Sequence, residues 1–155
     1  MLKLHHVGIA VKDVHEAMKI YRLIPGFIIR QPGVREMPEF GVKSAVISTE
    51  EDPSNAVIEL VEPMDNDARF GITTKNFLND RGEGLFYITL FTDNFDHDLK
   101  DLKERGFHLI SEEYKTLFPG STARLAWLQP AETRGAWITL ADAASVPESR
   151  GGFAP

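Results

Sequence analysis

The sequence contains no cysteine among its 155 residues. That absence excludes disulfide bonds, thiolate-based zinc sites and a cysteine nucleophile. No apolar run reaches the roughly 18–20 residues of a membrane-spanning helix, so we expect no membrane partner. Basic residues are in the minority, 17 against 23 acidic ones for a net charge of −6, which argues against a nucleic-acid partner. From these absences we expect a cytoplasmic protein that acts on a small molecule.

Hydrophobic residues make up 43% of the chain, enough for one compact domain with a sizeable core. The N-terminal segment MLKLHHVGIAV enters an apolar, β-branched strand pattern at once, so no signal peptide is expected. Asp13 and Glu16 then have the spacing of a capping box, which predicts the start of a helix. Pro25 and Gly26 predict its end.

The two halves of the chain repeat one order of elements. In the first half, the strand and helix are followed by FIIR, VKSAVIS and AVIELV, which are typical of strands. In the second half, LFYITLF and a helix are followed by FHLISEEY, TARLAWLQ and AWITLA. Tyr87 follows His6 by 81 residues (87 − 6), and Thr139 follows Glu59 by 80 (139 − 59). The spacing predicts two copies of a βαβββ unit.

These observations divide the chain into four segments. Residues 1–62 form the first module and residues 85–142 the second. The linker between them, residues 63–84, is expected to hold a short helix around Thr74 to Leu78. Residues 143–155 are rich in Pro, Gly and Ser, which predicts a flexible tail.

Glu59 is the most informative single residue, because it interrupts the apolar strand VIELV. A buried carboxylate needs a partner or gives up its charge. Alternation along the first strand places His6 on one face and His5 on the other, so His6 is the partner we expect and His5 is expected to be structural. In the second half the matching positions carry Tyr87 and Thr139.

The sequence resembles the vicinal oxygen chelate superfamily, which contains glyoxalases, bleomycin resistance proteins and dioxygenases, over roughly residues 3–142. The resemblance rests on LHHVGIAV with the helix DVHEAMKIY, on VIELVEP, and on the late QPAETRGAWITL. The linker FLNDRGEGL and the segment PEFGV at 38–42 look most like methylmalonyl-CoA epimerase. The resemblance implies an α+β fold in which two βαβββ modules form a cupped mixed sheet around one pocket. It also implies a homodimer, since members of this superfamily often dimerise.

The resemblance further implies a divalent metal, which members of the family hold between four strands. By position, His6 and Glu59 correspond to the first two metal ligands. Tyr87 and Thr139 stand where a histidine and a glutamate are expected, and Ser44 stands where the epimerase has an additional carboxylate base. Catalytic metals usually have at least three protein ligands, so this ligand set is incomplete and the cofactor stays open.

Each candidate also has a purely structural interpretation. His6 could bind a metal, be a hydrogen-bonded strand histidine, or act with Glu59 as a metal-free general base. Tyr87 could donate a hydrogen bond to a substrate oxygen or simply belong to the core. Arg124 could bind a carboxylate or phosphate, or point outward into solvent.

Three functions follow from these alternatives. We favour a small-molecule enzyme, an isomerase or lyase that transfers a proton next to a carbonyl at a site without metal, because a pure binder has little reason to keep Glu59. The alternatives are a non-catalytic binding or sequestering protein and a metal-dependent epimerase, glyoxalase or dioxygenase. In every case the expected ligand has an oxygenated end and an apolar body. The predicted catalytic residues are His6, Glu59 and Tyr87, and the predicted substrate-binding residues are Ser44, Phe91, Arg124, Trp127, Trp137 and Thr139.

Overall fold

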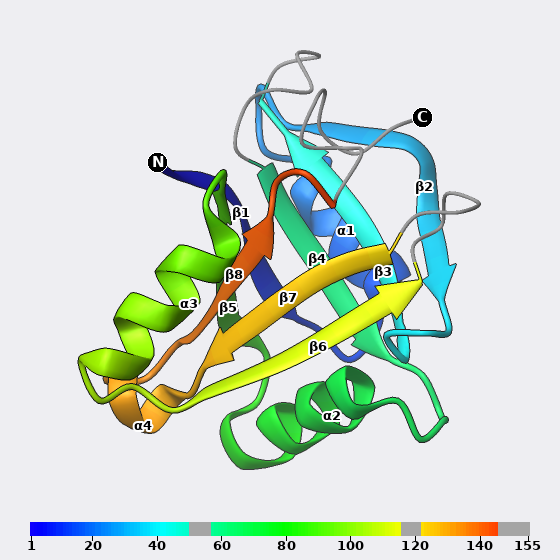
Figure 1. The fold of residues 1–155 in the computed structure, drawn as a ribbon. Helices are drawn as coiled ribbons and strands as arrows, with labels where there is room; N and C mark the ends of the chain where they lie inside the picture. Colours follow the sequence, from blue (N-terminus) through cyan, green and yellow to red (C-terminus); the bar gives the residue numbers. More distant parts are fainter. Residues whose placement is uncertain (50–56, 116–121, 146–155) are drawn as a thin grey trace.

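The computed structural model describes residues 1–49, 57–115 and 122–145 (Figure 1). Residues 50–55, whose polar sequence EEDPSN predicts a turn, and residues 146–155 of the expected tail lie outside the described residues. Within the described ranges, the first module consists of β1 (Leu2–Ala10), α1 (Val14–Tyr21), β2 (Ile28–Met37), β3 (Val42–Ser48) and β4 (Val57–Pro63). The helix α2 (Arg69–Arg81) follows it. The second module consists of β5 (Gly84–Thr92), α3 (Phe95–Glu104), β6 (Leu109–Lys115), β7 (Thr122–Leu128), α4 (Pro130–Thr133) and β8 (Trp137–Asp142).

The two modules share one sheet of eight strands in the order β2-β3-β4-β1-β5-β8-β7-β6. Within each module the first and last strands are parallel, β1 with β4 and β5 with β8. The modules meet at the antiparallel pair β1–β5. The predicted α+β class with two βαβββ modules in a mixed sheet is therefore confirmed. The sheet curves, and we call its concave face the cup (Figure 1).

Two helices cover the outer face of the sheet. The helix α1 packs Val14 and Met18 against a core that includes Ile47 and Leu60. Its predicted start is confirmed, because the Asp13 carboxylate accepts hydrogen bonds from the backbone amides of residues 15 and 16 at 2.8 and 3.0 Å. In the second module, α3 packs its own apolar face, Phe95 and Leu99, against β7 and β8. Both helices therefore leave the cup uncovered.

The third long helix, α2, lies across the end of the cup rather than on the outer face (Figure 1). It has 13 residues, so the short helix expected around Thr74 to Leu78 was placed correctly but made too short. No side chain caps its start; instead the backbone amide of Gly71 donates to the carbonyl of Phe40 at 2.8 Å. A tertiary contact thus satisfies an amide that sequence patterns assign to a capping residue.

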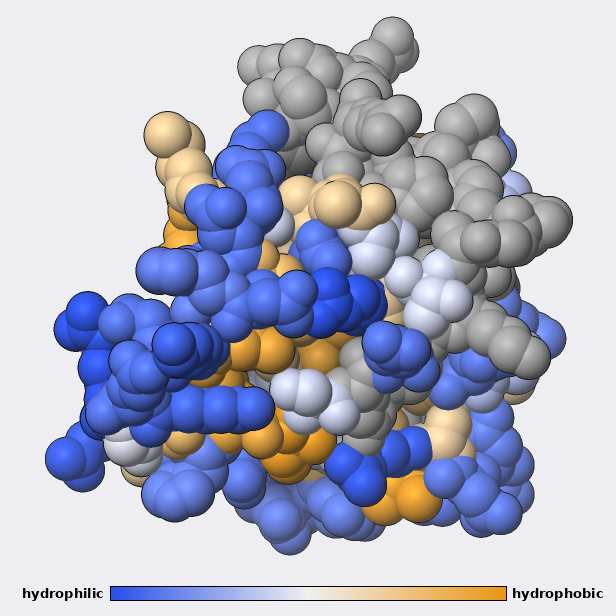
Figure 2. All heavy atoms as spheres, viewed as in Figure 1, coloured by the Kyte–Doolittle hydropathy of each residue, from blue (hydrophilic) through white to orange (hydrophobic). Residues whose placement is uncertain are grey.

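Two further elements differ from the expectation. The strand β2 continues to Met37, well past the FIIR segment, and α4 was not expected. Pro130 opens α4, where its missing amide hydrogen costs nothing. In the described ranges, no helix has the length and apolar character needed to cross a membrane. Figure 2 shows apolar residues in the middle of the viewed face, within a border of hydrophilic ones.

Candidate functional site

The cup contains a cavity of about 970 Å³, part of which is open to solvent. Most strands of the sheet contribute to its wall, and Phe70 of α2 closes one end. Most of the predicted site residues line this cavity, namely His6, Ser44, Glu59, Tyr87, Phe91, Trp127 and Thr139. The remaining wall is formed by His5, Arg35, Met37, Phe40, Val46, Thr89, Ala123, Leu125 and Ala141.

Strand register brings the polar residues together. Glu59 of β4 and Tyr87 of β5 both have Gly8 of β1 as their cross-strand partner, so the three residues form one row across the sheet. The next row runs from His6 through Thr89 to Thr139. Residues more than fifty positions apart in the sequence thereby become neighbours on one face of the sheet.

The Glu59 carboxylate is the centre of this arrangement. One oxygen, Oε1, accepts a hydrogen bond from the Ser44 hydroxyl at 2.5 Å. The other, Oε2, accepts a hydrogen bond from the Tyr87 hydroxyl and lies 3.3 Å from Nε2 of His6. The expected contact between His6 and Glu59 is therefore present. We call these four residues the polar cluster.

The charge state of the cluster follows from burial and from these donors. Burial alone would raise the pKa of Glu59, but the hydrogen bond and charge of His6, helped by Ser44 and Tyr87, lower this pKa to about 2. Burial and the neighbouring Glu59 charge raise the pKa of Tyr87 well above its usual 10. At neutral pH the cluster therefore holds an ionised carboxylate and a protonated phenol that donates to it.

Gly8 provides the space in which Tyr87 reaches Glu59. A Cβ atom built on Gly8 would lie only 1.9 Å from Cε1 of the Tyr87 ring. The ring thus lies directly over the Gly8 backbone, between the two strands that flank β1. A glycine inside a strand commonly marks such a close approach.

His5 also lines the cavity, and the expectation that it faces away from His6 was wrong. The register between β1 and β5 shifts between Leu4 and His6, which makes His5 the extra residue of a β-bulge. Its ring stacks on Phe91 at 4.1 Å between centroids, and its Nδ1 lies 2.7 Å from Nδ1 of His6. Burial, followed by the neighbouring His6, lowers the pKa of His5 to about 3, so it is neutral at pH 7.

Thr89 was not predicted as a site residue, although alternation places it on the same face as Tyr87. Thr89 and Thr139 are cross-strand partners, both buried, and both line the cavity. Among the residues that the structure describes, neither hydroxyl takes part in a hydrogen bond. Both are therefore available as donors to a ligand oxygen.

Two of the predicted site residues lie elsewhere. Arg124 is on the opposite face of β7 from Trp127, and its guanidinium binds Asp96 and, at 3.1 Å, Asp142. The structure therefore does not bring Arg124 to the cavity. Trp137 lines a second, adjoining cavity beside α2.

The residues of the cup do not fit the divalent metal that the resemblance implies. In the described ranges, no group of three or more His, Asp or Glu side chains is arranged to hold a metal ion. At the third position, Tyr87 is a protonated donor to Glu59 and not a phenolate ligand. At the fourth position, Thr139 offers only a neutral hydroxyl, which is a weak donor to a metal.

The chain is similar to known proteins in both sequence and structure. The family model of the Glyoxalase/Bleomycin resistance protein/Dioxygenase superfamily matches residues 5–123. Mitochondrial methylmalonyl-CoA epimerase of Bos taurus is 28% identical over 142 residues, covering 91% of this chain and 74% of that protein. The structure of hypothetical protein BH1468 from Bacillus halodurans C-125 has a TM-score of 0.72 and 27% identity, covering 91% of this chain and 94% of that one. A variant of Streptomyces coelicolor methylmalonyl-CoA epimerase in complex with 2-nitronate-propionyl-CoA has a TM-score of 0.70 and 26% identity, covering 93% and 96%.

Proposed function

Because the chain belongs to the Glyoxalase/Bleomycin resistance protein/Dioxygenase superfamily, we propose that it is an enzyme that transfers a proton at a carbon next to a carbonyl group. Its relatives include methylmalonyl-CoA epimerases, which are isomerases, and this supports an enzymatic role. The observation that carries the proposal is the buried Glu59 carboxylate, which three donors hold at the wall of a cavity large enough for a small molecule.

In the proposed reaction, His6 accepts the proton and Glu59 remains ionised beside it. The contact of Nε2 with Glu59 orients the imidazole and stabilises the imidazolium that forms. The C–H bond breaks, its proton goes to Nδ1 of His6, and its electron pair moves onto the carbonyl oxygen as an enolate. Delivery of a proton to a different atom of the enolate, or to the opposite face of the same carbon, completes an isomerisation. Loss of a leaving group from the enolate, with re-formation of the carbonyl, completes a lyase reaction.

The hydroxyls of Thr89 and Thr139 are the proposed donors to the enolate oxygen. They continue the cross-sheet row that begins at His6, so a carbonyl oxygen bound by them has its α-carbon close to the imidazole. Loss of one such donor typically costs on the order of 10²–10³ in rate. A neutral donor pair suits this role because it stabilises the developing charge without a metal.

His5 limits access to His6, because Nδ1 of His5 lies 2.7 Å from Nδ1 of His6, the nitrogen that accepts the proton. The substrate therefore displaces His5 from this contact before reaction. A His5→Phe variant retains a ring that stacks on Phe91 but removes the competing nitrogen, and we expect it to keep or exceed the native rate. A loss of activity in His5→Phe would instead mean that the proton passes through His5.

The test of the proposed function is hydrogen–deuterium exchange, measured by proton NMR in D₂O. The carbonyl compounds are methylmalonyl-CoA and 4-phenyl-2-butanone, and the protein is treated with EDTA beforehand. We expect exchange next to the carbonyl to persist in EDTA and to fall by roughly 10²-fold or more in His6→Ala and in Glu59→Gln. His15→Ala is the matched control, since His15 is exposed on the outer helix α1.

Two other results would contradict this proposal. Exchange that EDTA abolishes would support the metal-dependent alternative. Binding of the carbonyl compounds without any exchange would support a non-catalytic binding protein, which the apolar wall of Val46, Ala123, Leu125 and Ala141 favours as the second candidate.

Homodimer formation and a cytoplasmic location stay predictions, to be tested by light scattering and by fractionation of cells.

A further inference from the structure

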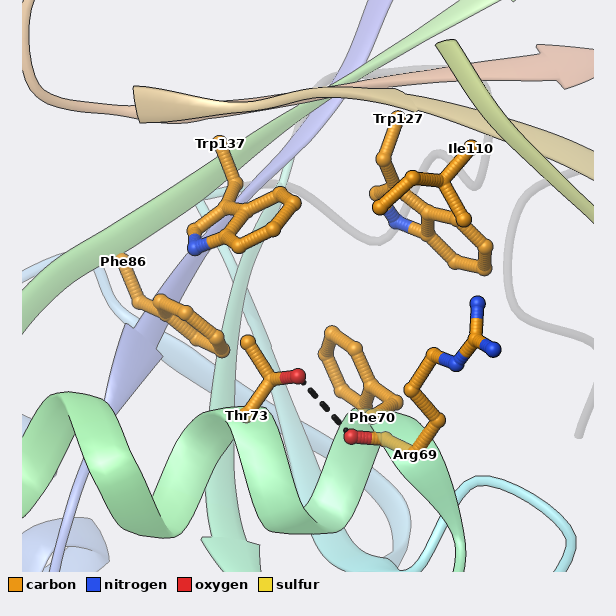
Figure 3. A pocket seen from close by; sticks show the side chains of 7 residues that line it. All are labelled: Arg69, Phe70, Thr73, Phe86, Ile110, Trp127 and Trp137. Atoms are coloured by element: carbon orange, nitrogen blue, oxygen red, sulfur yellow. Dashed lines mark hydrogen bonds between the residues drawn. The ribbon is translucent and has the colours of Figure 1, made fainter. Parts of the chain in front are cut away.

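A second cavity adjoins the polar cluster and has a different chemical character. It lies between the sheet and α2, with a volume of about 400 Å³ that is partly open to solvent. Figure 3 shows Trp127 and Trp137 projecting from the strands, while Phe70 rises toward them from the helix below. Phe86 closes one side. We call these four aromatic residues the indole slot.

The sheet register sets the spacing of the two indoles. Trp127 of β7 is the cross-strand partner of Thr139, and Trp137 lies two residues before Thr139 on β8, on the same face. The two tryptophans are therefore diagonal neighbours, whose Cα atoms lie roughly 7–8 Å apart in a sheet. The two indoles therefore project from neighbouring strands into the same cavity.

The slot is continuous with the cavity that contains the polar cluster. Phe70 and Trp127 line both spaces. The Phe70 ring meets the Tyr87 ring edge-on, with centroids 5.4 Å apart and planes at 81°. Because the Tyr87 hydroxyl binds Glu59, a ring held on Phe70 lies one residue away from the polar cluster.

The lining of the slot points to a ring system rather than to a polar tail, because aromatic and aliphatic side chains outnumber the polar ones around it. The surrounding side chains are mostly aromatic, and aromatic pairs gain roughly two- to tenfold in affinity beyond simple burial of area.

We propose that the indole slot binds a planar aromatic ring of the substrate, whose carbonyl end lies at Thr89, Thr139 and the polar cluster. This inference rests on the proposed function and narrows its substrate class to aromatic carbonyl compounds with a short spacer between the ring and the carbonyl. The spacer crosses the Phe70 side chain, which together with Trp127 lines both cavities.

The chain is suited to a direct test, because its two tryptophans are both in the slot. Intrinsic tryptophan fluorescence therefore reports on this cavity, through Trp137, and on the wall that it shares with the larger cavity, through Trp127. The probe is 4-phenyl-2-butanone, and its matched control is 4-cyclohexyl-2-butanone, which has the same carbonyl and spacer but a saturated ring. We expect the phenyl compound to change the fluorescence with a dissociation constant about tenfold lower than that of the cyclohexyl compound.

Variants localise the effect. Trp137→Leu should weaken binding of the phenyl compound about tenfold and leave binding of the cyclohexyl compound nearly unchanged, with Trp127 still reporting. Tyr21→Leu is the control, since Tyr21 is the last residue of α1 and packs against the core on the outer face of the sheet. Equal dissociation constants for the two compounds on the native protein would overturn the proposal without any variant.

The proposed function and this inference can fail separately. Glu59→Gln should retain the preference for the phenyl ring while losing deuterium exchange. If methylmalonyl-CoA undergoes exchange but the phenyl compound does not bind, the enzymatic role stands and the aromatic substrate class is wrong. If the phenyl compound binds in the slot without exchange, the slot stands and the proton-transfer role is wrong.

Discussion

At the scale of single residues, the polar cluster depends on the absence of a side chain at Gly8. Tyr87 crosses β1 to reach Glu59 only because Gly8 has no Cβ atom in the path of its ring. His6, helped by the hydrogen bonds from Ser44 and Tyr87, then keeps the buried carboxylate ionised. A glycine far from either partner in sequence is therefore part of the electrostatics of the site.

This predicts a clear effect of Gly8→Ala. The added methyl group would meet the Tyr87 ring at 1.9 Å, so the ring must move and its bond to Glu59 must break. We expect a loss of about 1–3 kcal/mol in the free energy of unfolding, measured by urea denaturation. In a Tyr87→Val background the same substitution should cost much less, because the clash is gone. An equal cost in both backgrounds would show that the two residues are not coupled.

At the scale of elements, small irregularities position the site more than the regular strands do. The bulge at His5 turns two consecutive histidines into the cup. The helix α2 is held against the sheet by a backbone contact at Gly71, whose amide binds the carbonyl of Phe40. That contact places Phe70, which lines both cavities.

Gly71→Ala should therefore disturb α2 as a whole. A Cβ atom at this position would lie 2.3 Å from the Gly41 carbonyl oxygen, which belongs to the backbone and cannot rotate away. We expect the variant to lose about 1–3 kcal/mol of stability in urea denaturation. It should also weaken the fluorescence response to 4-phenyl-2-butanone, because Phe70 moves with the helix. Asn76→Ala, on the exposed side of the same helix, is the control and should change neither property.

At the scale of the whole molecule, the buried site makes stability depend on pH. The pKa of His5 is about 3 in the folded protein against 6.5 in its ordinary state, and that of Glu59 is about 2 against 4.5. In both cases the unfolded chain binds more protons than the folded one between these values. Stability is therefore present at neutral pH and is lost as the pH falls, first through His5 and then through Glu59.

This pH dependence is tested by measuring the free energy of unfolding by urea denaturation at pH 7.5, 6.0, 5.0 and 4.0. A fully buried group contributes up to about 1.4 kcal/mol per pH unit, and His5 should contribute less because it is partly exposed. His5→Phe should flatten the curve between pH 6.5 and 4.5 and leave the steeper loss at lower pH. His15→Phe should follow the native curve. An unchanged slope in His5→Phe would contradict the neutral, buried state assigned to His5.

Much of the architecture can be predicted from local patterns. The alternation of strands, the capping-box spacing of Asp13 and Glu16 and the 80-residue repeat together predict two βαβββ modules, because each pattern reflects the local structure of one element. The isolated carboxylate in VIELV likewise predicts a buried Glu59 with a partner. Alternation also separates Arg124 from Trp127, since the two lie an odd number of positions apart in one strand and cannot both face the cup.

The sequence by itself thus determined the modules, their order and the polar face that holds His6 and Glu59. Only the tertiary structure decided that His5 turns inward, that Ser44 and Tyr87 share the Glu59 carboxylate, and that α2 forms a second cavity with the two tryptophans. The physical reason is the separation along the chain between the residues that determine each feature. Periodicity records how one segment is buried, whereas a bulge, a strand register and a helix docked through a glycine depend on partners far away in the chain.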